Sequence, residues 1–256
     1  GQTDQQKKDM MTYLKRVNPY PSNVVLHTHS DDHYQDEYLV PMLGFEHLDG
    51  PSMQIANPLR VHERVLKWID ESEKAGKRWL VNLDEIGPAH KGVMPDSHDP
   101  DHDTIRQHCL WGTLMAGGGV EWYFGYRFPH NDLNCEDFRS RANWWKQSTI
   151  ATQFINSLPL EEMKSMDELL KDKDAYCLAL PGKLYVVYLP AGTKEAGIWI
   201  DKTGDSGDYT VKWFNPREGG ELQDGSLTTL AGGGMRNPGS PPADATTADW
   251  VLVLAR

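Results

Sequence analysis

The chain has 256 residues, of which 39% are hydrophobic and 25% charged, an ordinary globular composition that suffices for one large domain or two smaller ones. Its formal net charge of -11, without any long run of Lys or Arg, argues against nucleic acid and anionic membrane surfaces as partners. The 9 Trp and 10 Tyr offer aromatic faces that suit sugar rings, although filling the core is their commoner use.

The cysteines and the hydrophobic runs narrow the class of protein further. Cys109, Cys135 and Cys177 are widely separated and lack C-x-x-C spacing, so they predict neither a zinc site nor a disulfide framework. We expect no metal and no other cofactor. No apolar run reaches about 18 residues, and the polar opening GQTDQQKKDMM does not have the pattern of a signal peptide. We therefore expect no membrane-spanning segment.

The first part of the chain alternates strand-like and helix-like segments. It opens with a helix over residues 3–17, for which Thr3 is the expected N-cap. There follow a strand at 23–30, a loop, a strand at 52–57, a helix at 59–76, a strand at 78–87, a polar loop, a helix at 101–118, a strand at 119–126 and a helix at 136–158. Such alternation predicts parallel strands with helices packed outside them.

After Pro159 the pattern changes to short alternating strands separated by Gly, Pro, Asn and Asp. Residues 160–174 form a helical or irregular connector, and residues 232–247 are expected to be a long loop. Strands are predicted at 175–180, 182–190, 196–201, 209–216 and 249–255. This pattern is typical of an antiparallel β-sandwich. The sequence thus predicts an α/β domain over residues 1–158 and an all-β accessory domain over residues 159–256.

Polar or aromatic residues end each of the four strands predicted in the first part. In a parallel β/α barrel, the ligand site lies at these carboxyl ends. For any one residue a helix cap or loop hydrogen bond is the commoner explanation, but four consecutive strands with such endings favour a site. The residues concerned are His27, His29, Gln54, Asn57, Asp84, Glu85, Trp122, Tyr123 and Tyr126.

Asp84 and Glu85 are adjacent acids at the end of an apolar run, and burying them is costly unless they are hydrogen-bonded or used. Because successive side chains of a strand alternate, we expect only one of them to face the barrel axis. A retaining glycosidase needs a nucleophilic carboxylate and a second, acid/base carboxylate about 5 Å away. We expect Glu85 to be the nucleophile and Asp84 to point the other way or along the rim.

The sequence around Glu85 resembles a known family. Asp84-Glu85-Ile86-Gly87 is similar to the strand-end Glu-x-Gly of clan A glycoside hydrolases, in which the nucleophile ends barrel strand seven and an aromatic residue closes strand eight. Trp122, on the next strand, matches that aromatic residue. The segments VNLDEIGP, PDHDTIRQHCLWGTLMAGGGVEWYFGY and PHNDLNCEDFRSRANWW resemble a group of bacterial glycoside hydrolases with an apiosidase-like (β/α)8 TIM barrel.

The resemblance also covers the second domain. YCLALPGKLYVVYLPAGT and YTVKWFNPREGG are similar to the C-terminal β-sandwich of that group, which carries the label "putative collagen-binding". In that group the acid/base follows strand four, before a helix that opens much like this chain. The resemblance implies that the chain holds barrel strands five to eight. The missing N-terminal half-barrel, from the same protein or a second chain, would then supply the acid/base.

Two other functions remain open on the sequence alone. The H-x-H of NVVLHTHSDDH is how several metal-dependent hydrolases hold their first metal ion, although such families usually carry an acid where this chain has Val25. Further ligands for such a site would come from Asp96, His98, Asp99, Asp101, His102 and Asp103, which otherwise form a solvated loop ending in a helix N-cap at Asp103 or Thr104. The second alternative is a non-catalytic carbohydrate-binding protein or degenerate barrel.

The favoured interpretation is a secreted or periplasmic bacterial glycosidase that retains configuration and degrades a polysaccharide or a derived oligosaccharide. Glu85 attacks the anomeric carbon, and Trp122 forms a platform for the sugar. Carbohydrate is the expected partner, with no nucleic acid and no membrane. The remaining candidates for substrate binding or for orienting Glu85 are His27, His29, Gln54, Asp84, His90, Tyr126 and His130.

Overall fold

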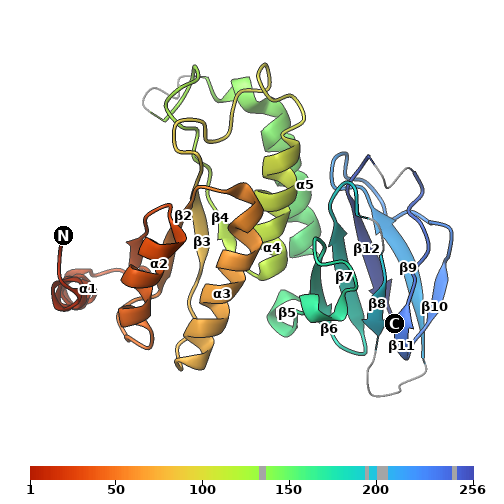
Figure 1. The fold of residues 1–256 in the computed structure, drawn as a ribbon, viewed down its shortest axis with the longest axis horizontal. Helices are drawn as coiled ribbons and strands as arrows, with labels where there is room; N and C mark the ends of the chain where they lie inside the picture. Colours follow the sequence, from red (N-terminus) through yellow and green to blue (C-terminus); the bar gives the residue numbers. More distant parts are fainter. Residues whose placement is uncertain (133–136, 194–195, 201–206, 244–246) are drawn as a thin grey trace. The chain divides into compact units, whose positions relative to one another are not determined.

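The computed structural model of the chain describes residues 1–132, 137–193, 196–200, 207–243 and 247–256. They form two compact units, Gly1–Ala142 and Asn143–Arg256. The first contains a parallel sheet and the second is built mainly of antiparallel strands (Figure 1). The boundary between the units falls after the first residue of helix α5 (Ala142–Asn156), so nearly all of α5 belongs to the second unit. The sequence instead predicts a domain boundary after that helix.

The parallel sheet has four strands in the order β1-β2-β3-β4, and each strand pairs in parallel with the next. This confirms the mixed α/β character of the first unit. Sequential order in a parallel sheet requires a crossover after each strand, which the helices supply. The strands are β1 (Val25–His27), β2 (Gly50–Ile55), β3 (Asn82–Ile86) and β4 (Gly119–Val120).

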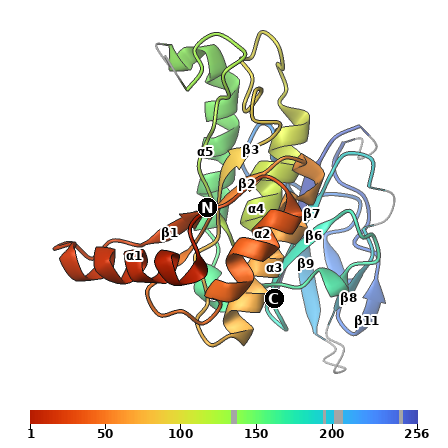
Figure 2. The same ribbon diagram turned by 60° about the vertical axis from the view of Figure 1, so that its left-hand side comes forward.

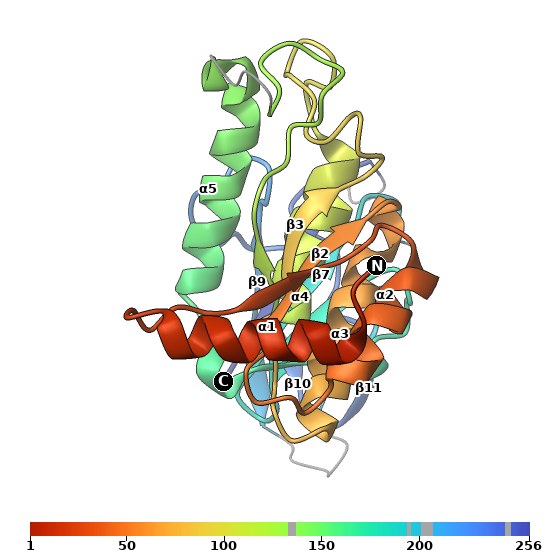
Figure 3. The same ribbon diagram turned by 90° about the vertical axis from the view of Figure 1, so that its left-hand side faces the viewer.

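Helices of the first unit lie along one face of this sheet, and α1 lies at its β1 edge (Figures 1 and 2). Figure 3 looks onto the other face. The α-helices are α1 (Asp4–Val17), α2 (Asp32–Leu39), α3 (Val61–Lys74) and α4 (Gly112–Ala116), the last continuing a π-helix, η3 (Ile105–Trp111). Short 3-10 turns are η1 (Val40–Met42), η2 (Pro58–Arg60) and η4 (Phe138–Arg141).

Local sequence explains where these helices form. Thr3 caps α1 through a capping box with Gln6, as predicted. Helix α3 buries Val61, Val65, Trp68 and Ile69, which share one face at helical spacing. Helix α4 ends at Gly117, whose φ of +85° is a conformation that residues with a Cβ rarely adopt.

Two parts of the first unit differ from the prediction. The segment after β1, expected to be a loop, contains helix α2. Asp31 caps this helix by accepting a hydrogen bond from the backbone N of His33 (2.9 Å). This short helix is mostly polar, so it lacks the apolar periodicity that reveals a helix. The strand predicted over residues 119–126 ends at Val120. Beyond it the chain turns away, with Gly125 at a φ of +70°.

Asp49 connects three segments of the first unit. Its carboxylate accepts hydrogen bonds from Lys15 of α1 (2.5 Å), the backbone N of Val24 (2.7 Å) and Lys77 (3.3 Å). Burial alone would raise the Asp49 pKa, but these three donors together hold it below its usual value.

Asp49→Asn is therefore expected to lower the free energy of unfolding by about 1 kcal/mol at pH 7. An acid with a depressed pKa stabilises the fold above its unfolded pKa, and that contribution is lost as the pH falls through the folded pKa. Urea unfolding at pH 7 and pH 3 should show a smaller difference between wild type and variant at the lower pH. Asp4→Asn, which removes only an exposed contact with Lys7, is the control. Equal effects of the two variants would contradict the role of Asp49.

The second unit carries a six-stranded antiparallel sheet in the order β10-β9-β12-β7-β6-β5 and a two-stranded sheet, β11-β8. Residues of α5 pack on it, and Phe154 stacks on Phe214 with ring centroids 4.4 Å apart. The strands are β5 (Lys164–Ser165), β6 (Tyr176–Leu180), β7 (Leu184–Leu189), β8 (Ile198–Ile200), β9 (Asp208–Phe214), β10 (Thr229–Ala231), β11 (Gly234–Arg236) and β12 (Trp250–Ala255).

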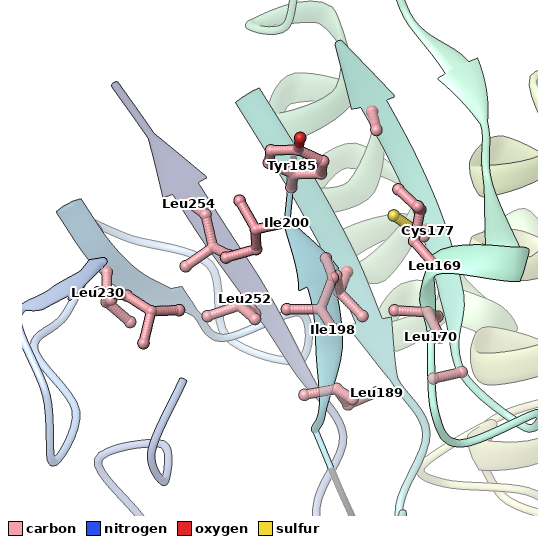
Figure 4. Packing of buried hydrophobic residues seen from close by; sticks show 14 of the residues in the cluster. Leu169, Leu170, Cys177, Tyr185, Leu189, Ile198, Ile200, Leu230, Leu252 and Leu254 are labelled. Carbon is pink, nitrogen blue, oxygen red and sulfur yellow. The ribbon is translucent and has the colours of Figure 1, made fainter. Parts of the chain in front are cut away.

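The core of this unit lies between the two sheets. Alternate residues such as Tyr185, Val187 and Leu189 of β7 contribute to it, together with Ile198 and Ile200 of β8 (Figure 4). The predicted antiparallel strands are confirmed, and the packing is sandwich-like. The loop expected over residues 232–247 contains β11, and β5 and β10 were also not predicted, because runs of two or three residues carry too little alternation to be recognised.

Two of the three cysteines belong to the described part of the chain. Cys109 and Cys177 are free and buried, and burial raises the pKa of both thiols. Cys135 lies outside the described residues. Among the helices that the structure describes, none combines the length and apolar character needed to cross a membrane.

Candidate functional site at the carboxyl ends of the parallel strands

Three neighbouring strands bring Glu85, Gln54 and His27 together. Gln54 of β2 pairs in register with Glu85 of β3, and its Nε2 donates a hydrogen bond to Glu85 Oε1 (2.6 Å). His27 of β1 places its Nε2 3.6 Å from Glu85 Oε2. The Glu85 side chain remains 20% exposed, so an external molecule can reach it. The sequence-predicted nucleophile therefore has two polar neighbours that were themselves predicted.

A β-bulge interrupts the regular alternation of β3 at Asp84. Met53 pairs with Leu83 and Gln54 pairs with Glu85, so Asp84 is an extra residue without a partner on β2. Ser52 lies near Asp84 and lowers its pKa, and Glu85 accepts a hydrogen bond from Gln54. Ser52 and Gln54 are two residues apart on one strand and therefore share a face. The bulge breaks the regular alternation on which the expectation that only one acid faces the site was based, and that expectation stays a prediction.

The environment of each acid favours its neutral form. Burial raises the pKa of Asp84, and the nearby Glu121 carboxylate adds to this effect, while Ser52 and His27 oppose it. Burial likewise raises the pKa of Glu85 and Asp132 contributes in the same direction, against His27 and Gln54. Groups with shifted pKa values gather at functional sites more often than elsewhere, which makes Asp84 and Glu85 candidates for such a site.

Residues beyond β4 complete the surroundings of Glu85. Burial raises the pKa of Tyr123, and Glu85 and Asp132 act on it in the same direction, which places all three groups close together. Asp132 is fixed in part by the backbone N of Phe124, which donates to its Oδ2 (3.0 Å). Ser52 and Glu121 were not identified from the sequence. Ser52 could have been found, since it lies two positions before Gln54 on the same strand.

Trp122 is half-buried and lies two residues past the end of β4 at Val120. Because the predicted strand ends early, Trp122 does not occupy the strand-end position that the resemblance assigned to it. The next residue, Tyr123, lies near enough to Glu85 for that carboxylate to raise its pKa. A platform formed by Trp122 stays a prediction.

The other predicted candidates do not join this group through any contact described for them. His29 Nδ1 accepts a hydrogen bond from the backbone N of Asp31 (3.2 Å), and its ring lies against Tyr34. His90 and Tyr126 pair with each other, with ring centroids 6.4 Å apart. His130 has a φ of +54°, and its carbonyl accepts a hydrogen bond from Arg141. These residues lie on loops beyond the strands.

Two of these loops are joined by backbone hydrogen bonds and by one buried arginine. The backbone N of Val93 donates to the carbonyl of Tyr123 (2.8 Å). Arg141 is completely buried and donates to the carbonyls of Val93 (2.6 Å) and His130 (2.9 Å). Its guanidinium also lies 4.5 Å from the ring centroid of Phe124. Arg141 therefore holds together the loops that carry Val93 and His130.

The acid-rich loop has a different structure from the solvated one expected. His102 is fully buried, and its Nε2 lies 2.8 Å from Asp96 Oδ1. Thr104 stands at the N-cap position of η3 but makes no side-chain capping hydrogen bond, and Asp103 pairs with Arg106 (2.6 Å). Across the residues that the structure describes, no group of three or more His, Cys, Asp or Glu side chains has a geometry that could hold a metal ion.

One family model matches the chain. It is described as "Putative collagen-binding domain of a collagenase", and it covers residues 163–255, from just before β5 to the end of β12. The match includes the whole antiparallel part of the second unit and none of the residues around Glu85. Among curated proteins, none matches the chain.

Proposed function

We propose that this chain is the catalytic and accessory part of a retaining glycoside hydrolase in which Glu85 is the nucleophile. The observation that carries the proposal is the position of Glu85 at the carboxyl end of a parallel sheet, half-buried yet accessible, with Gln54 and His27 on its two oxygens. A carboxylate held in this way can attack an anomeric carbon that approaches from the open side. The substrate is a polysaccharide or a derived oligosaccharide.

The four-stranded parallel sheet is, in this proposal, half of an eight-stranded barrel. Four strands in sequential order with helices on one face are what half a barrel would contribute. Apolar side chains at the β1 edge support the proposal, since a soluble sheet edge is normally covered or charged. Those exposed are Met10, Tyr13, Leu14 and Val17 of α1, together with Tyr20 and Val25.

The missing half also supplies the acid/base carboxylate and covers these apolar residues. We therefore expect the 256-residue chain alone to bind the dye 8-anilinonaphthalene-1-sulfonate, and a longer protein or a complex with four more strand–helix repeats to bind much less. Amide hydrogen exchange at Val25–His27 should slow in the completed protein, whereas that of β7 should not change. Equal protection of β1 in both forms would contradict the half-barrel.

Covalent labelling tests the nucleophile directly. A 2-fluoro glycoside with a good leaving group transfers its glycosyl unit to the attacking carboxylate, and the electron-withdrawing fluorine slows hydrolysis of the resulting ester. Peptide mass mapping of the complete protein is expected to find the sugar on Glu85. A label on Asp84 would reverse the assignment of the two acids. If a saturating reagent labels neither acid while the protein still hydrolyses the parent sugar, the proposed mechanism is wrong.

A specific feature of the second unit favours binding as an additional or alternative function. A cavity of about 550 Å³, within the range usual for small-ligand sites, is lined by residues that include Trp213, Trp250 and Arg236. This unit is also the part that matches the family described as collagen-binding. A secreted or periplasmic location suits either ligand, a polysaccharide or an extracellular protein. If the protein binds polysaccharide but the 2-fluoro glycoside does not label Glu85, the result would favour a binding function without catalysis.

A further inference from the structure

The cavity of the second unit, with a volume of about 550 Å³, lies where several strands of the two sheets end. Strand β7 ends at Leu189, which pairs with Trp250, the first residue of β12. Strand β11 ends at Arg236, which pairs with Ile198 at the start of β8. Leu189, Arg236 and Trp250 all line the cavity, so these strand ends meet around it. Its described lining residues all belong to the second unit, and none of the residues described around Glu85 is among them.

The exposure of the lining residues distinguishes an inner end from a mouth. Leu189, Trp213 and Trp250 are each at most 7% exposed and form an apolar inner end. Asn237 and Ser240 are exposed and place an amide and a hydroxyl at the mouth. Sugar rings have apolar C–H faces and hydroxyl edges, and small-ligand sites commonly combine apolar walls with a few polar groups. The cavity therefore suits a sugar residue.

The charge around the cavity is opposite in sign to that of the whole chain. Lys171 and Arg236 both line it, and none of its described lining residues is Asp or Glu. The chain as a whole has a formal net charge of -11. A cavity lined by charges of one sign attracts ligands of the other sign. The ligand is therefore expected to be an anion.

Three backbone carbonyls hold the side chain of Arg236 in place. Its Nε donates to Ala231 (2.9 Å), its Nη2 to Gly232 (2.9 Å) and its Nη1 to Met235 (3.3 Å). A guanidinium has five N–H groups, so one on each terminal nitrogen has no acceptor among the described residues. A carboxylate can accept from both terminal nitrogens at once, and a side chain that is already fixed loses little freedom on binding. Arg236 is thus prepared to bind a carboxylate.

We propose that this cavity binds a uronic acid residue of an acidic polysaccharide. Arg236 binds the carboxylate, the ring lies toward Trp213 and Trp250, and Asn237 and Ser240 bind hydroxyl groups. The choice of a saccharide rests on the proposed function, whereas the need for a carboxylate rests on the cavity alone. A site of this kind retains the protein on the polymer that it degrades.

Binding can be measured on the full chain without any turnover. The probes are D-galacturonate and D-glucuronate, with D-galactose and D-glucose as neutral counterparts and acetate as a carboxylate without a ring. Indole 1H–15N signals of Trp213 and Trp250, assigned by triple-resonance spectra, report on the cavity during each titration. We expect at least one uronate to shift both signals to saturation. Its neutral counterpart and acetate should bind about tenfold more weakly or worse, because each lacks part of the recognised chemistry.

Variants test whether the cations of the cavity recognise the carboxylate. Arg236→Gln should weaken uronate binding about tenfold or more and leave the weak binding of the neutral sugar unchanged. Lys171→Gln should weaken uronate binding by a smaller factor. Lys212→Gln is the matched control, since Lys212 belongs to the same unit but pairs with Asp224 (2.7 Å) and does not line the cavity. Amide spectra check that each variant is folded, and the comparison of acidic with neutral sugar decides if Arg236→Gln is not.

Several results would overturn the proposal. These are equal affinities for a uronate and its neutral counterpart, unchanged uronate binding in folded Arg236→Gln, and the absence of any shift at Trp213 and Trp250. Tighter binding of 4-hydroxycinnamate than of either uronate would show that the cavity takes an aromatic acid instead of a sugar. The proposed function fails separately. A chain that binds uronate but is not labelled at Glu85 by the 2-fluoro glycoside contradicts that function alone, and a labelled chain that binds no uronate contradicts this inference alone.

Discussion

Glu85→Gln is expected to lower turnover of the complete enzyme by several orders of magnitude with little change in folding. The amide has the shape of the carboxylate and can still accept a hydrogen bond from Gln54, but it has neither the charge nor the nucleophilicity needed for attack. The measurement is kcat on an aryl glycoside together with urea unfolding of both proteins. In Glu85→Ala, added azide should restore turnover by attacking the anomeric carbon in place of the carboxylate and should give a glycosyl azide of inverted configuration.

Asp84→Asn is the matched control for this loss. It removes the charge next to Glu85 in the sequence, and we expect a smaller decrease in turnover than in Glu85→Gln. Folding should be unaffected or slightly strengthened at pH 7, because burial raises the Asp84 pKa and so makes the ionised form less favourable in the folded state than in the unfolded state. The stability associated with a raised pKa is present below the unfolded pKa and is lost as the pH rises through the folded pKa. Full activity in Glu85→Gln would remove the proposed mechanism.

Arg141→Ala is expected to have the largest effect on stability, a loss of about 3 kcal/mol or more in the free energy of unfolding. The substitution leaves the buried carbonyls of Val93 and His130 without their charged donor and opens space next to Phe124. Lys91 and Arg127 lie on the two loops that Arg141 connects, so tryptic cleavage at both positions should become faster. Denaturant unfolding and timed digestion measure the two consequences.

The neighbouring Arg139 supplies the control for Arg141. Its side chain is 73% exposed and contacts only Asp137 among the charged groups described for it. Arg139→Ala should therefore change the free energy of unfolding by less than about 0.5 kcal/mol and leave the digestion pattern unaltered. Similar stability losses in Arg139→Ala and Arg141→Ala would show that the buried hydrogen bonds of Arg141 do not hold the loops.

Strand-end residues could be predicted from the sequence because they depend on local alternation and on a general property of parallel sheets. That reasoning identified Glu85, Gln54 and His27, which the structure brings together. It did not predict the bulge at Asp84, because a bulge leaves no recognisable mark in one sequence. It also did not predict that β4 ends at Val120, beyond which the carbonyl of Tyr123 accepts a hydrogen bond from the backbone N of Val93.

Packing between distant segments explains the other differences. Helix α2 has little apolar periodicity and is stabilised by contacts with α3, where Arg64 donates to Gln35 (3.0 Å) and Asp36 (2.6 Å). His102 looked like part of a solvated loop, yet it is buried against Asp96. The contacts of α2 come from α3, and the contact of His102 comes from Asp96 across a turn. Neither contact can be recognised from the spacing of residues in the sequence. Sequence patterns therefore predicted the sheet better than its surroundings.

The bulge in β3 shows how a strand can gain a functional group without altering its existing contacts. Residues on either side of Asp84 keep regular pairing, Leu83 with Met53 and Glu85 with Gln54. Asp84 is thus equivalent to a one-residue insertion whose effect is absorbed locally. Deleting it would leave an uninterrupted ladder that still presents Glu85 to Gln54. A second acid could accordingly have been added to an older site that had only one, without any change in how the sheet and its helices pack.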